Sequence, residues 1–294
     1  MSNLNGAMPE LPEVEITARL LDRALAGAQI ESALAPGINA LKTFDPPLSA
    51  LAGGRVAAVR RRGKHLIVEI DGLADRLALL IHLMSAGRFQ LYDKRAGPRD
   101  RTSRLLVRLQ DGRELRLREF GSRQAAWVKL LRGAALELDD ALATLGPEAW
   151  PDPGGWARLK ELLDAPRPLH TLLRDQRTIA GIGRSWVDEI LWRAKLSPYK
   201  RGADLSEAEA RALRDATIEK LGGAIVHYEQ TVTLPIPDKL PMPLQVHRHE
   251  GEPCPRCQTM LRAVHFEDYV IAYCPECQTE GRALKDRRLS RLLR

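Results

Sequence analysis

The chain has no long hydrophobic run, and its beginning lacks the apolar core that a secretory signal peptide needs. Its longest apolar run, LALLIHLM at residues 77–84, is far too short to cross a membrane. The first thirty residues already contain several charged side chains, among them Glu10, Glu13, Glu15, Arg19 and Asp22. We therefore expect a cytoplasmic protein, in the bacterial cytosol or nucleoid, that makes no contact with membranes.

Cysteine is scarce, with four residues among 294. These four form two pairs, CPRC at 254–257 and CPEC at 274–277, and residues 258–273 lie between them. This spacing is typical of a structural zinc site in which two knuckles flank a hairpin. Two disulfides or an iron–sulfur centre are the alternatives, and the reducing cytosol favours a metal over disulfides. The pattern predicts one structural Zn²⁺ per chain, bound by Cys254, Cys257, Cys274 and Cys277.

Acidic residues are in deficit, because 38 Asp and Glu stand against 45 Lys and Arg, which gives a net charge of +7. The isoelectric point is near 9.4. Runs of arginine at 60–62 and between 113 and 118 concentrate the positive charge locally. An excess of this kind favours a polyanionic partner such as nucleic acid, and a solvated basic surface is the alternative.

The texture of the sequence changes along the chain. A helix beginning near Pro12 and capped by Gly27 precedes short runs of Val, Ile and Leu, with a turn at 110–112, that predict a β-sandwich or barrel. After a Pro- and Gly-rich linker the period becomes helical, and Ser206 with Glu209 forms a capping box. The segment 233–243 breaks this regularity, and the cysteine module and a basic tail follow.

These changes predict a multi-domain α+β protein. The expected parts are an extension (1–7), a catalytic β-sandwich domain with the leading helix (8–131), a linker (132–156), a helical domain (157–240), a zinc β-hairpin (241–280) and a basic tail (281–294).

Several motifs occur in one order along the chain. They are MPELPEVE at 8–15, RRRGKHL at 60–66, HL followed by MSAG at 82–87, LGPE at 145–148, DQRTIAGIG at 175–183, DEILW at 188–192 and GEPCPRC at 251–257. The two glycines of GIG alone are a common turn, although they also suit a phosphate at a helix start. Together the motifs, spanning residues 8 to about 278, resemble the formamidopyrimidine-DNA glycosylase and endonuclease VIII family of repair enzymes.

The resemblance implies a β-sandwich domain, a helix-two-turn-helix DNA-binding domain and a zinc hairpin. It implies a monomeric DNA glycosylase and abasic-site lyase of base excision repair, acting on double-stranded DNA that contains damaged bases or abasic sites. Such enzymes extrude the damaged nucleotide, because its reacting sugar carbon is inaccessible in the base stack.

The expected nucleophile is the amine of Pro9, with Glu10 as the acid that assists opening of the sugar ring and Lys64 contacting the backbone of the damaged nucleotide. An α-amino group titrates near about 7.7–8.0 and a lysine near about 10.4, so a terminal proline holds far more free base at neutral pH. This role requires the functional chain to begin at Pro9, with Met8 as the initiator. The alternative is that Pro9 and Pro12 merely start a helix.

The resemblance also implies DNA contacts. Arg62 and Arg184 are expected to contact phosphates, and Met84 to fill the gap left by the extruded nucleotide, with a core methionine on a strand as the alternative. Three positions depart from the family pattern: Arg184 replaces an Asn, Tyr269 an Arg of the hairpin, and His170 a Lys. We expect Tyr269 to stack or to donate one hydrogen bond in place of the missing Arg.

Two other classes of function compete with the enzyme. The first is a catalytically inactive protein that binds damaged DNA on the same scaffold, because residues 1–7 block Pro9. The second is a zinc-ribbon accessory protein of transcription or replication, which explains the cysteines and the charge but not MPELPEVE.

Overall fold

The computed structural model describes residues 8–97, 100–120, 124–266 and 269–285. The expected extension 1–7 and most of the expected basic tail therefore lie outside the described residues. The chain forms two compact units, unit 1 with residues 1–144 and 227–241, and unit 2 with residues 145–226 and 242–294. None of the described helices has the length and apolar character required to span a membrane.

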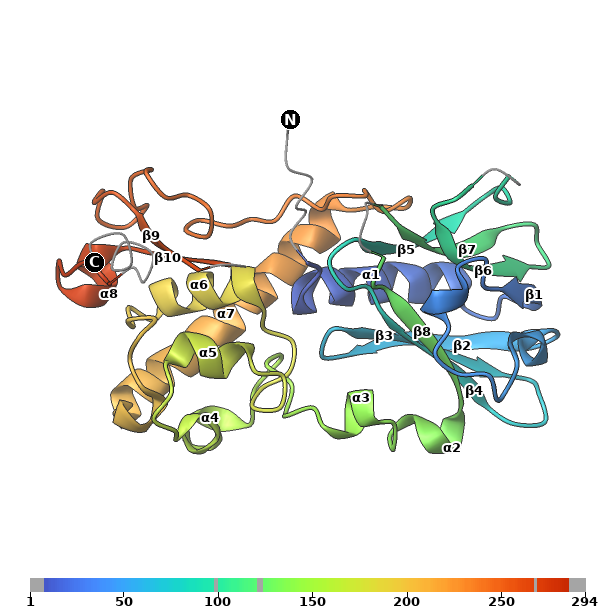
Figure 1. Ribbon diagram of the computed structural model, residues 1–294, viewed down its shortest axis with the longest axis horizontal. Helices are drawn as coiled ribbons and strands as arrows, with labels where there is room; N and C mark the ends of the chain where they lie inside the picture. Colours follow the sequence, from blue (N-terminus) through green and yellow to red (C-terminus); the bar gives the residue numbers. More distant parts are fainter. Residues whose placement is uncertain (1–7, 98–99, 121–123, 267–268, 286–294) are drawn as a thin grey trace, which may run out of the picture. The chain divides into compact units, whose positions relative to one another are not determined.

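The elements follow in chain order (Figure 1). Residues 8–144 contain α1 (Leu11–Leu25), β1 (Ile30–Leu34), η1 (Ile38–Ala40), η2 (Leu48–Leu51), β2 (Arg55–Arg62), β3 (His65–Asp71), β4 (Leu77–His82), β5 (Gly87–Tyr92), β6 (Ser103–Leu109), β7 (Glu114–Glu119), β8 (Trp127–Arg132), α2 (Gly133–Leu136) and α3 (Asp140–Ala143). The later elements are α4 (Gly155–Leu163), α5 (Leu169–Arg174), α6 (Arg184–Arg193), η3 (Gly202–Asp204), α7 (Glu207–Thr231), β9 (Arg262–His265), β10 (Val270–Tyr273) and α8 (Pro275–Thr279).

Helix α1 begins and ends as the sequence predicts. Pro12 lies in its first turn, where a missing N–H costs nothing, and Glu13 lies at the positive end of its dipole. Gly27 follows the helix with a φ of +73°, a conformation that glycine adopts without strain. The helix buries one face, which includes Val14, Leu21 and Leu25.

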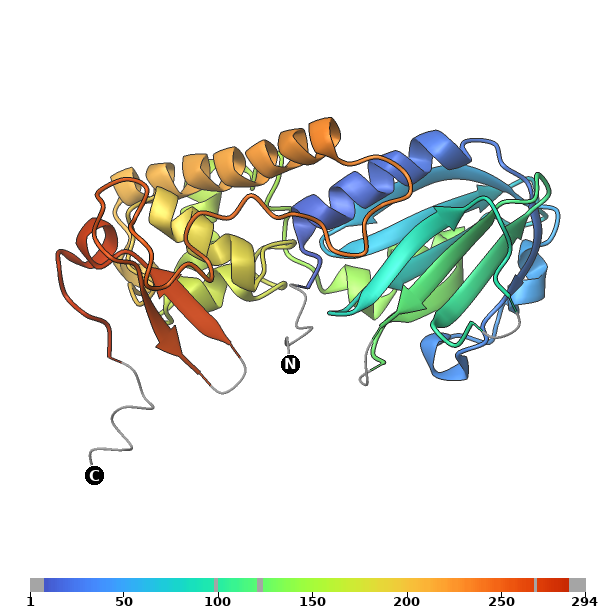
Figure 2. The ribbon, with the colours of Figure 1, turned by 90° about the horizontal axis from the view of Figure 1, so that it is seen from above.

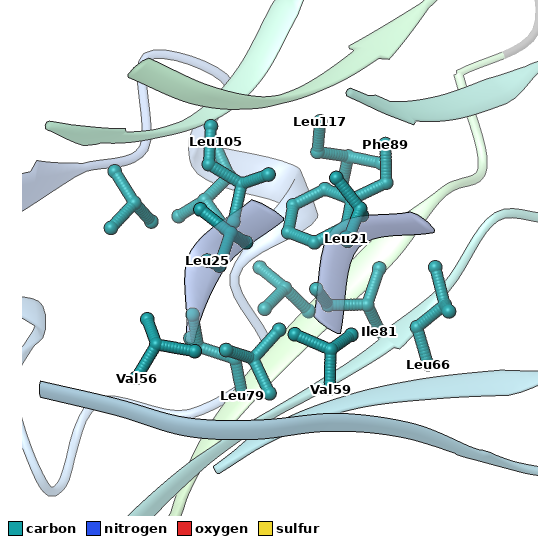
Figure 3. Packing of buried hydrophobic residues seen from close by; sticks show 14 of the residues in the cluster. Leu21, Leu25, Val56, Val59, Leu66, Leu79, Ile81, Phe89, Leu105 and Leu117 are labelled. Atoms are coloured by element: carbon teal, nitrogen blue, oxygen red, sulfur yellow. The ribbon is translucent and has the colours of Figure 1, made fainter. Parts of the chain in front are cut away.

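Unit 1 contains two antiparallel sheets, with strand orders β2-β3-β4-β8 and β1-β6-β7-β5. Alternation along the strands directs one set of side chains into the space between the sheets. The predicted turn at 110–112 joins β6 to β7, with Gly112 at a φ of +91°. Figure 3 shows Leu21 and Leu25 of α1 between side chains of the two sheets, which include Phe89, Leu117 and Val59. This interlocking core gives the sandwich and its leading helix one hydrophobic interior.

The segment after the linker is helical, as the period of its sequence predicts. The capping box at the start of α7 is present, since the amide of Glu209 donates to Ser206 Oγ at 3.2 Å and the amide of Ser206 donates to Glu209 Oε2 at 2.9 Å. The helical pattern of the sequence covers residues 206–223, and α7 continues beyond it to Thr231. A Cβ at position 222 would lie 3.0 Å from Trp150 Nε1, so this glycine serves close packing rather than helix termination.

The cysteine module contains the two-stranded hairpin of β9 and β10, followed by the short helix α8 (Figure 2). A small apolar cluster that includes Trp192, Val246 and Leu261 packs with the buried Cys254 and Cys274. The multi-domain α+β architecture, with a β-sandwich, a helical domain and a cysteine-bearing hairpin, is thus confirmed.

Candidate functional site

The start of α1 carries Pro9 and Glu10. Pro9 is half-buried, and Glu10 is the N-cap residue with 2% of its surface exposed. The backbone N–H of Glu10 donates to Glu13 Oε2 at 2.9 Å, and the Glu10 side chain accepts from the backbone N–H of Glu13. This reciprocal capping box fixes the backbone that follows Pro9, so the nitrogen of Pro9 is carried on an ordered segment.

Glu13 is buried and also accepts a hydrogen bond from Tyr228 of α7, with 2.7 Å between the Tyr228 hydroxyl and Glu13 Oε1. Burial and the nearby Glu10 carboxylate raise the pKa of Glu13 from 4.5 to about 7, against the opposing effect of the Tyr228 hydrogen bond. Burial and the neighbouring Glu13 carboxylate raise the pKa of Tyr228, so its phenol stays a donor. Two buried acids therefore stand one turn apart at the start of α1.

A salt bridge attaches β2 to α1. Arg61 Nε lies 2.6 Å from Glu15 Oε2, and the side chains of Arg61 and Glu15 are 6% and 15% exposed. Because Arg61 is the penultimate residue of β2, this pair holds the end of the strand against the helix. The next residues are Arg62 and then the β2–β3 turn, in which Gly63 has a φ of +57° and Lys64 is half-buried.

Met84 lies in the turn between β4 and β5 rather than on a strand. The interpretation of Met84 as a core strand residue is therefore wrong. Its φ is +50°, its side chain is half-buried, and its backbone N–H donates to His82 Nδ1 at 3.0 Å. Since His65 pairs with His82 across β3 and β4, the Lys64 turn and the Met84 turn lie at the same end of one sheet.

The rings of His65, His82 and Trp127 form a cluster beside these turns. The ring centroids of His65 and His82 are 4.7 Å apart, and those of His82 and Trp127 are 5.8 Å apart with nearly parallel planes. Burial lowers the pKa of His65 to about 4 and that of His82 to about 3. A neutral His82 retains the lone pair that accepts the N–H of Met84, so the hydrogen bond persists at physiological pH.

In unit 2, the side chain of Gln176 forms two hydrogen bonds with the backbone of the loop before α6. Gln176 Oε1 accepts the N–H of Gly181 at 2.9 Å, and Gln176 Nε2 donates to the carbonyl of Ile182 at 2.8 Å. Gly181 has a φ of +106°, which requires glycine. Gly183 is the N-cap residue of α6, and Arg184 is its first helical residue. The loop therefore presents Arg184 from a fixed position.

The predicted metal ligands lie together. The four Sγ atoms of Cys254, Cys257, Cys274 and Cys277 are all within 4.8 Å of one another, and the Cys254–Cys277 and Cys257–Cys274 separations are 4.0 Å and 3.4 Å. Four Zn–S bonds of about 2.3 Å in a tetrahedron give sulfur separations of about 3.8 Å. All four cysteines are free thiols in the structure. The cluster therefore has the donor set and the spacing of a tetrathiolate metal site.

Some residues of the site have little local sequence signal. Tyr228 is more than 200 positions from Glu13 along the chain, and no spacing connects the two. Arg174, whose guanidinium lies over the ring of Tyr269, stands in an ordinary helical segment. Glu13 carried a usable signal, because an acid three residues after an N-cap residue is the spacing of a capping box.

Two family models match the chain. The model for the formamidopyrimidine-DNA glycosylase N-terminal domain matches residues 8–123, and the model for the formamidopyrimidine-DNA glycosylase H2TH domain matches residues 145–235. Together these matches cover most of the β-sandwich domain and the helical domain. The first match begins at residue 8, where the MPELPEVE motif begins.

Curated relatives extend over almost the whole chain. A formamidopyrimidine-DNA glycosylase of Thermus thermophilus is 36% identical over 295 residues, covering 93% of this chain and 100% of the relative. A formamidopyrimidine-DNA glycosylase of Streptococcus thermophilus is 31% identical over 281 residues, covering 92% of this chain and 99% of the relative.

Solved structures give the same result. The Lactococcus lactis formamidopyrimidine-DNA glycosylase bound non-covalently to DNA with an abasic site is 29% identical, with a TM-score of 0.79 and coverage of 92% of this chain and 99% of that chain. The same Lactococcus protein in complex with DNA containing N7-benzyl-Fapy-dG gives a TM-score of 0.81 at 29% identity, covering 92% of this chain and 100% of that chain.

Proposed function

Since this chain belongs to the formamidopyrimidine-DNA glycosylase family, it is a DNA repair glycosylase with abasic-site lyase activity, and we propose that the amine of Pro9 is its nucleophile. Its substrate is double-stranded DNA that contains damaged bases or abasic sites, as in the solved Lactococcus complexes. The bacterial sources of the relatives support a location in the bacterial cytosol.

The reaction begins when the Pro9 nitrogen attacks C1′ of the extruded nucleotide and the bond to the damaged base breaks. Opening of the sugar ring at the C1′–O4′ bond, with a proton supplied to O4′ by Glu10, then leaves an iminium at C1′. The iminium acidifies the neighbouring C2′, and loss of a proton from C2′ expels the 3′ phosphate and cleaves the strand. Only an amine with a free lone pair can take this role, so the Pro9 nitrogen can act only when residues 1–8 are absent from the active chain. With Met8 attached, the Pro9 nitrogen is an amide.

The observation that carries this proposal is the ordered, buried start of α1. Glu10, held by the capping box with Glu13, is placed beside Pro9 and assists opening of the sugar ring. Lys64 is carried by the turn that follows β2, and the buried Arg61–Glu15 pair attaches β2 to α1. We assign Lys64 to the backbone of the damaged nucleotide.

Four residues are assigned to holding the DNA. Arg62 and Arg184 contact phosphates, and Met84 enters the gap that the extruded nucleotide leaves. The turn geometry of Met84 supports this assignment, because a half-buried side chain at a loop tip can reach a partner that a core strand residue cannot. Tyr269 belongs to the same DNA-binding set.

We further assign one structural Zn²⁺ per chain to Cys254, Cys257, Cys274 and Cys277. The support is the mutual spacing of their four Sγ atoms and the small size of the apolar cluster around them. A bound zinc supplies a tetrahedral cross-link to a hairpin that has little core of its own. The bound metal would join Cys254 and Cys257, which precede β9, to Cys274 and Cys277, which follow β10.

The test is borohydride trapping on duplex DNA with an abasic site. Three proteins are compared: a chain that starts at Met1, a chain that starts at Pro9, and the Pro9→Gly variant of the short chain. We expect a covalent adduct from the Pro9-start chain and none from the full chain. Equal trapping by both would assign the nucleophile to another amine, with Lys64 examined first. No trapping by either, with DNA binding retained, would identify the inactive DNA-binding protein instead.

A further inference from the structure

Three residues at which the sequence departs from the family pattern lie in one cluster. His170, Arg184 and Tyr269 come from α5, α6 and the residue before β10, and the structure brings them into contact. Arg174, the last residue of α5, and Phe266 complete the group. We call these five residues the Tyr269 cluster, and all of them belong to unit 2.

The ring of Tyr269 is the centre of this cluster. The Phe266 ring stacks on it with 4.4 Å between centroids and 5° between planes, and the His170 ring lies 5.8 Å away at 11°. Two guanidiniums approach the same ring, with the Cζ atom of Arg174 at 4.4 Å and that of Arg184 at 5.5 Å from its centroid. Both distances are within the range of a cation–π interaction.

His170, which lies beside the Tyr269 ring, is itself held by a buried carboxylate. His170 is 1% exposed, and its Nε2 lies 3.4 Å from Oδ1 of the fully buried Asp188. Asp188 Oδ2 accepts the N–H of Ala272 on β10 at 3.0 Å and contacts His247 Nδ1 at 2.7 Å. The buried Asp188 carboxylate therefore connects α6 to β10 of the hairpin. It also contacts His170, so the His170 ring that packs beside Tyr269 has little freedom to move.

These contacts place two positive groups near one aromatic surface that itself carries no charge. Arg174, Arg184 and Tyr269 are each half-buried, so each retains a solvent-facing part. Arginine loses much side-chain freedom when it is held in one geometry, and an aromatic face provides that restraint before a ligand arrives. Two planar guanidiniums held in this way match the oxygens of phosphate groups.

We propose that Tyr269 is a positioning residue that holds Arg174 and Arg184 as a two-arginine clamp for the phosphate backbone of DNA. This inference rests on the DNA-binding function proposed above and deepens it. In the family pattern the hairpin carries a phosphate-binding arginine. Here the positive charges are those of Arg174 in α5 and Arg184 in α6, and the hairpin contributes the aromatic ring of Tyr269. Tyr269 thus acts through the two arginines and not as a platform for a base.

The test is a double-mutant cycle on DNA affinity, measured on an undamaged labelled duplex at several salt concentrations. We expect Arg174→Gln and Arg184→Gln each to weaken binding and to lower the log–log salt slope by about one. Tyr269→Met and Tyr269→Leu should weaken binding about three- to tenfold although they remove no charge, the size of a lost cation–π restraint. In the Arg174→Gln/Arg184→Gln background the same changes should cost less than about twofold, because the groups that Tyr269 positions are gone.

Tyr269→Phe is the conservative variant, and it should restore the binding that Tyr269→Met loses, because the ring and not the hydroxyl holds the arginines. Arg211→Gln is the matched control, since it removes an arginine of unit 2 whose guanidinium lies over Trp156 at 3.9 Å, outside the cluster. We expect Arg211→Gln to leave the affinity within about twofold. Metal content and thermal unfolding, measured for every variant, report whether the hairpin is intact.

The outcomes separate this inference from the proposed function. If the original chain binds duplex DNA and the Tyr269 and arginine effects simply add, Tyr269 contacts DNA directly and the positioning role is refuted. If Tyr269→Phe is as damaging as Tyr269→Met, the hydroxyl is the active group and the inference fails as well. If the original chain does not bind duplex DNA in a salt-dependent manner, the proposed function and the inference both fail.

Discussion

The buried carboxyl of Glu13 predicts a specific dependence of stability on pH, which Glu13→Gln removes. Glu13 has almost no exposed surface, and its pKa in the folded chain is about 7 against an ordinary value of 4.5. Glutamine has nearly the same shape and can still accept the N–H of Glu10, but it does not titrate. The difference between the original chain and this variant therefore isolates the proton of Glu13.

The sign follows from where the proton is bound. Below pH 4.5 both the folded and the unfolded chain hold the proton, and the contribution of Glu13 is at its most favourable. As the pH rises towards 7 the unfolded chain releases the proton while the folded chain keeps it, so the folded state loses stability. The loss is complete above the folded pKa and amounts to about 3 kcal/mol, from about 1.36 kcal/mol per pH unit.

The assay is calorimetric unfolding of both proteins between pH 5 and pH 8, read at the transition of unit 1. Over this interval we expect the stability of the original chain to fall relative to Glu13→Gln by about 2.5 kcal/mol, or about 5–10 °C in Tm. Glu137→Gln, which alters a carboxylate that is 68% exposed, is the matched control. If the difference between the original chain and Glu13→Gln stays constant with pH, Glu13 does not remain protonated in the folded chain and the reasoning is refuted.

Three further predictions follow from the core, the Met84 turn and the cysteine cluster. Leu21→Ala opens a cavity between the two sheets and should cost about 2–5 kcal/mol in unfolding free energy, whereas a cost below about 1 kcal/mol would contradict the packing. His82→Phe keeps a ring but removes the acceptor of the Met84 N–H. Single-turnover base excision should slow severalfold, with a stability change of about 1 kcal/mol. An unchanged rate would show that the Met84 turn has no part in the reaction. Elemental analysis should find one zinc per chain and none in Cys257→Ser, while a metal-free original protein or a disulfide between these cysteines would refute the zinc assignment.

Much of the fold was predictable because its signals are local. The proline at the start of α1, the glycine after it, the turn at Gly112 and the capping box of Ser206 each depend on residues a few positions apart. Helix α7 shows where such signals fail. A glycine such as Gly222 is often found at a helix end, but here the close approach of Trp150 accounts for the glycine. Trp150 lies 72 positions away, so no local sequence pattern shows this contact.

The candidate site divides in the same way. The cysteine spacing and the MPELPEVE motif are short-range patterns. The first predicted that the four cysteines lie together, and the second pointed to the segment of Pro9 and Glu10. Met84 was ambiguous, because a methionine after an apolar run fits a strand as well as a turn. In the structure Met84 lies in a turn after β4, where its backbone N–H donates to His82 Nδ1.

The sequence alone determined the family and the four cysteines that lie together, because these depend on chemical identity and short spacing. The tertiary structure alone decided which distant groups share an environment. Tyr228 donates a hydrogen bond to Glu13, 215 positions away along the chain, and Glu10 and Glu13 are both buried. The three departures at His170, Arg184 and Tyr269 become one cluster only when α5, α6 and the hairpin pack together. Burial and contact set pKa values and side-chain geometry, and both are properties of the folded chain that no linear pattern contains.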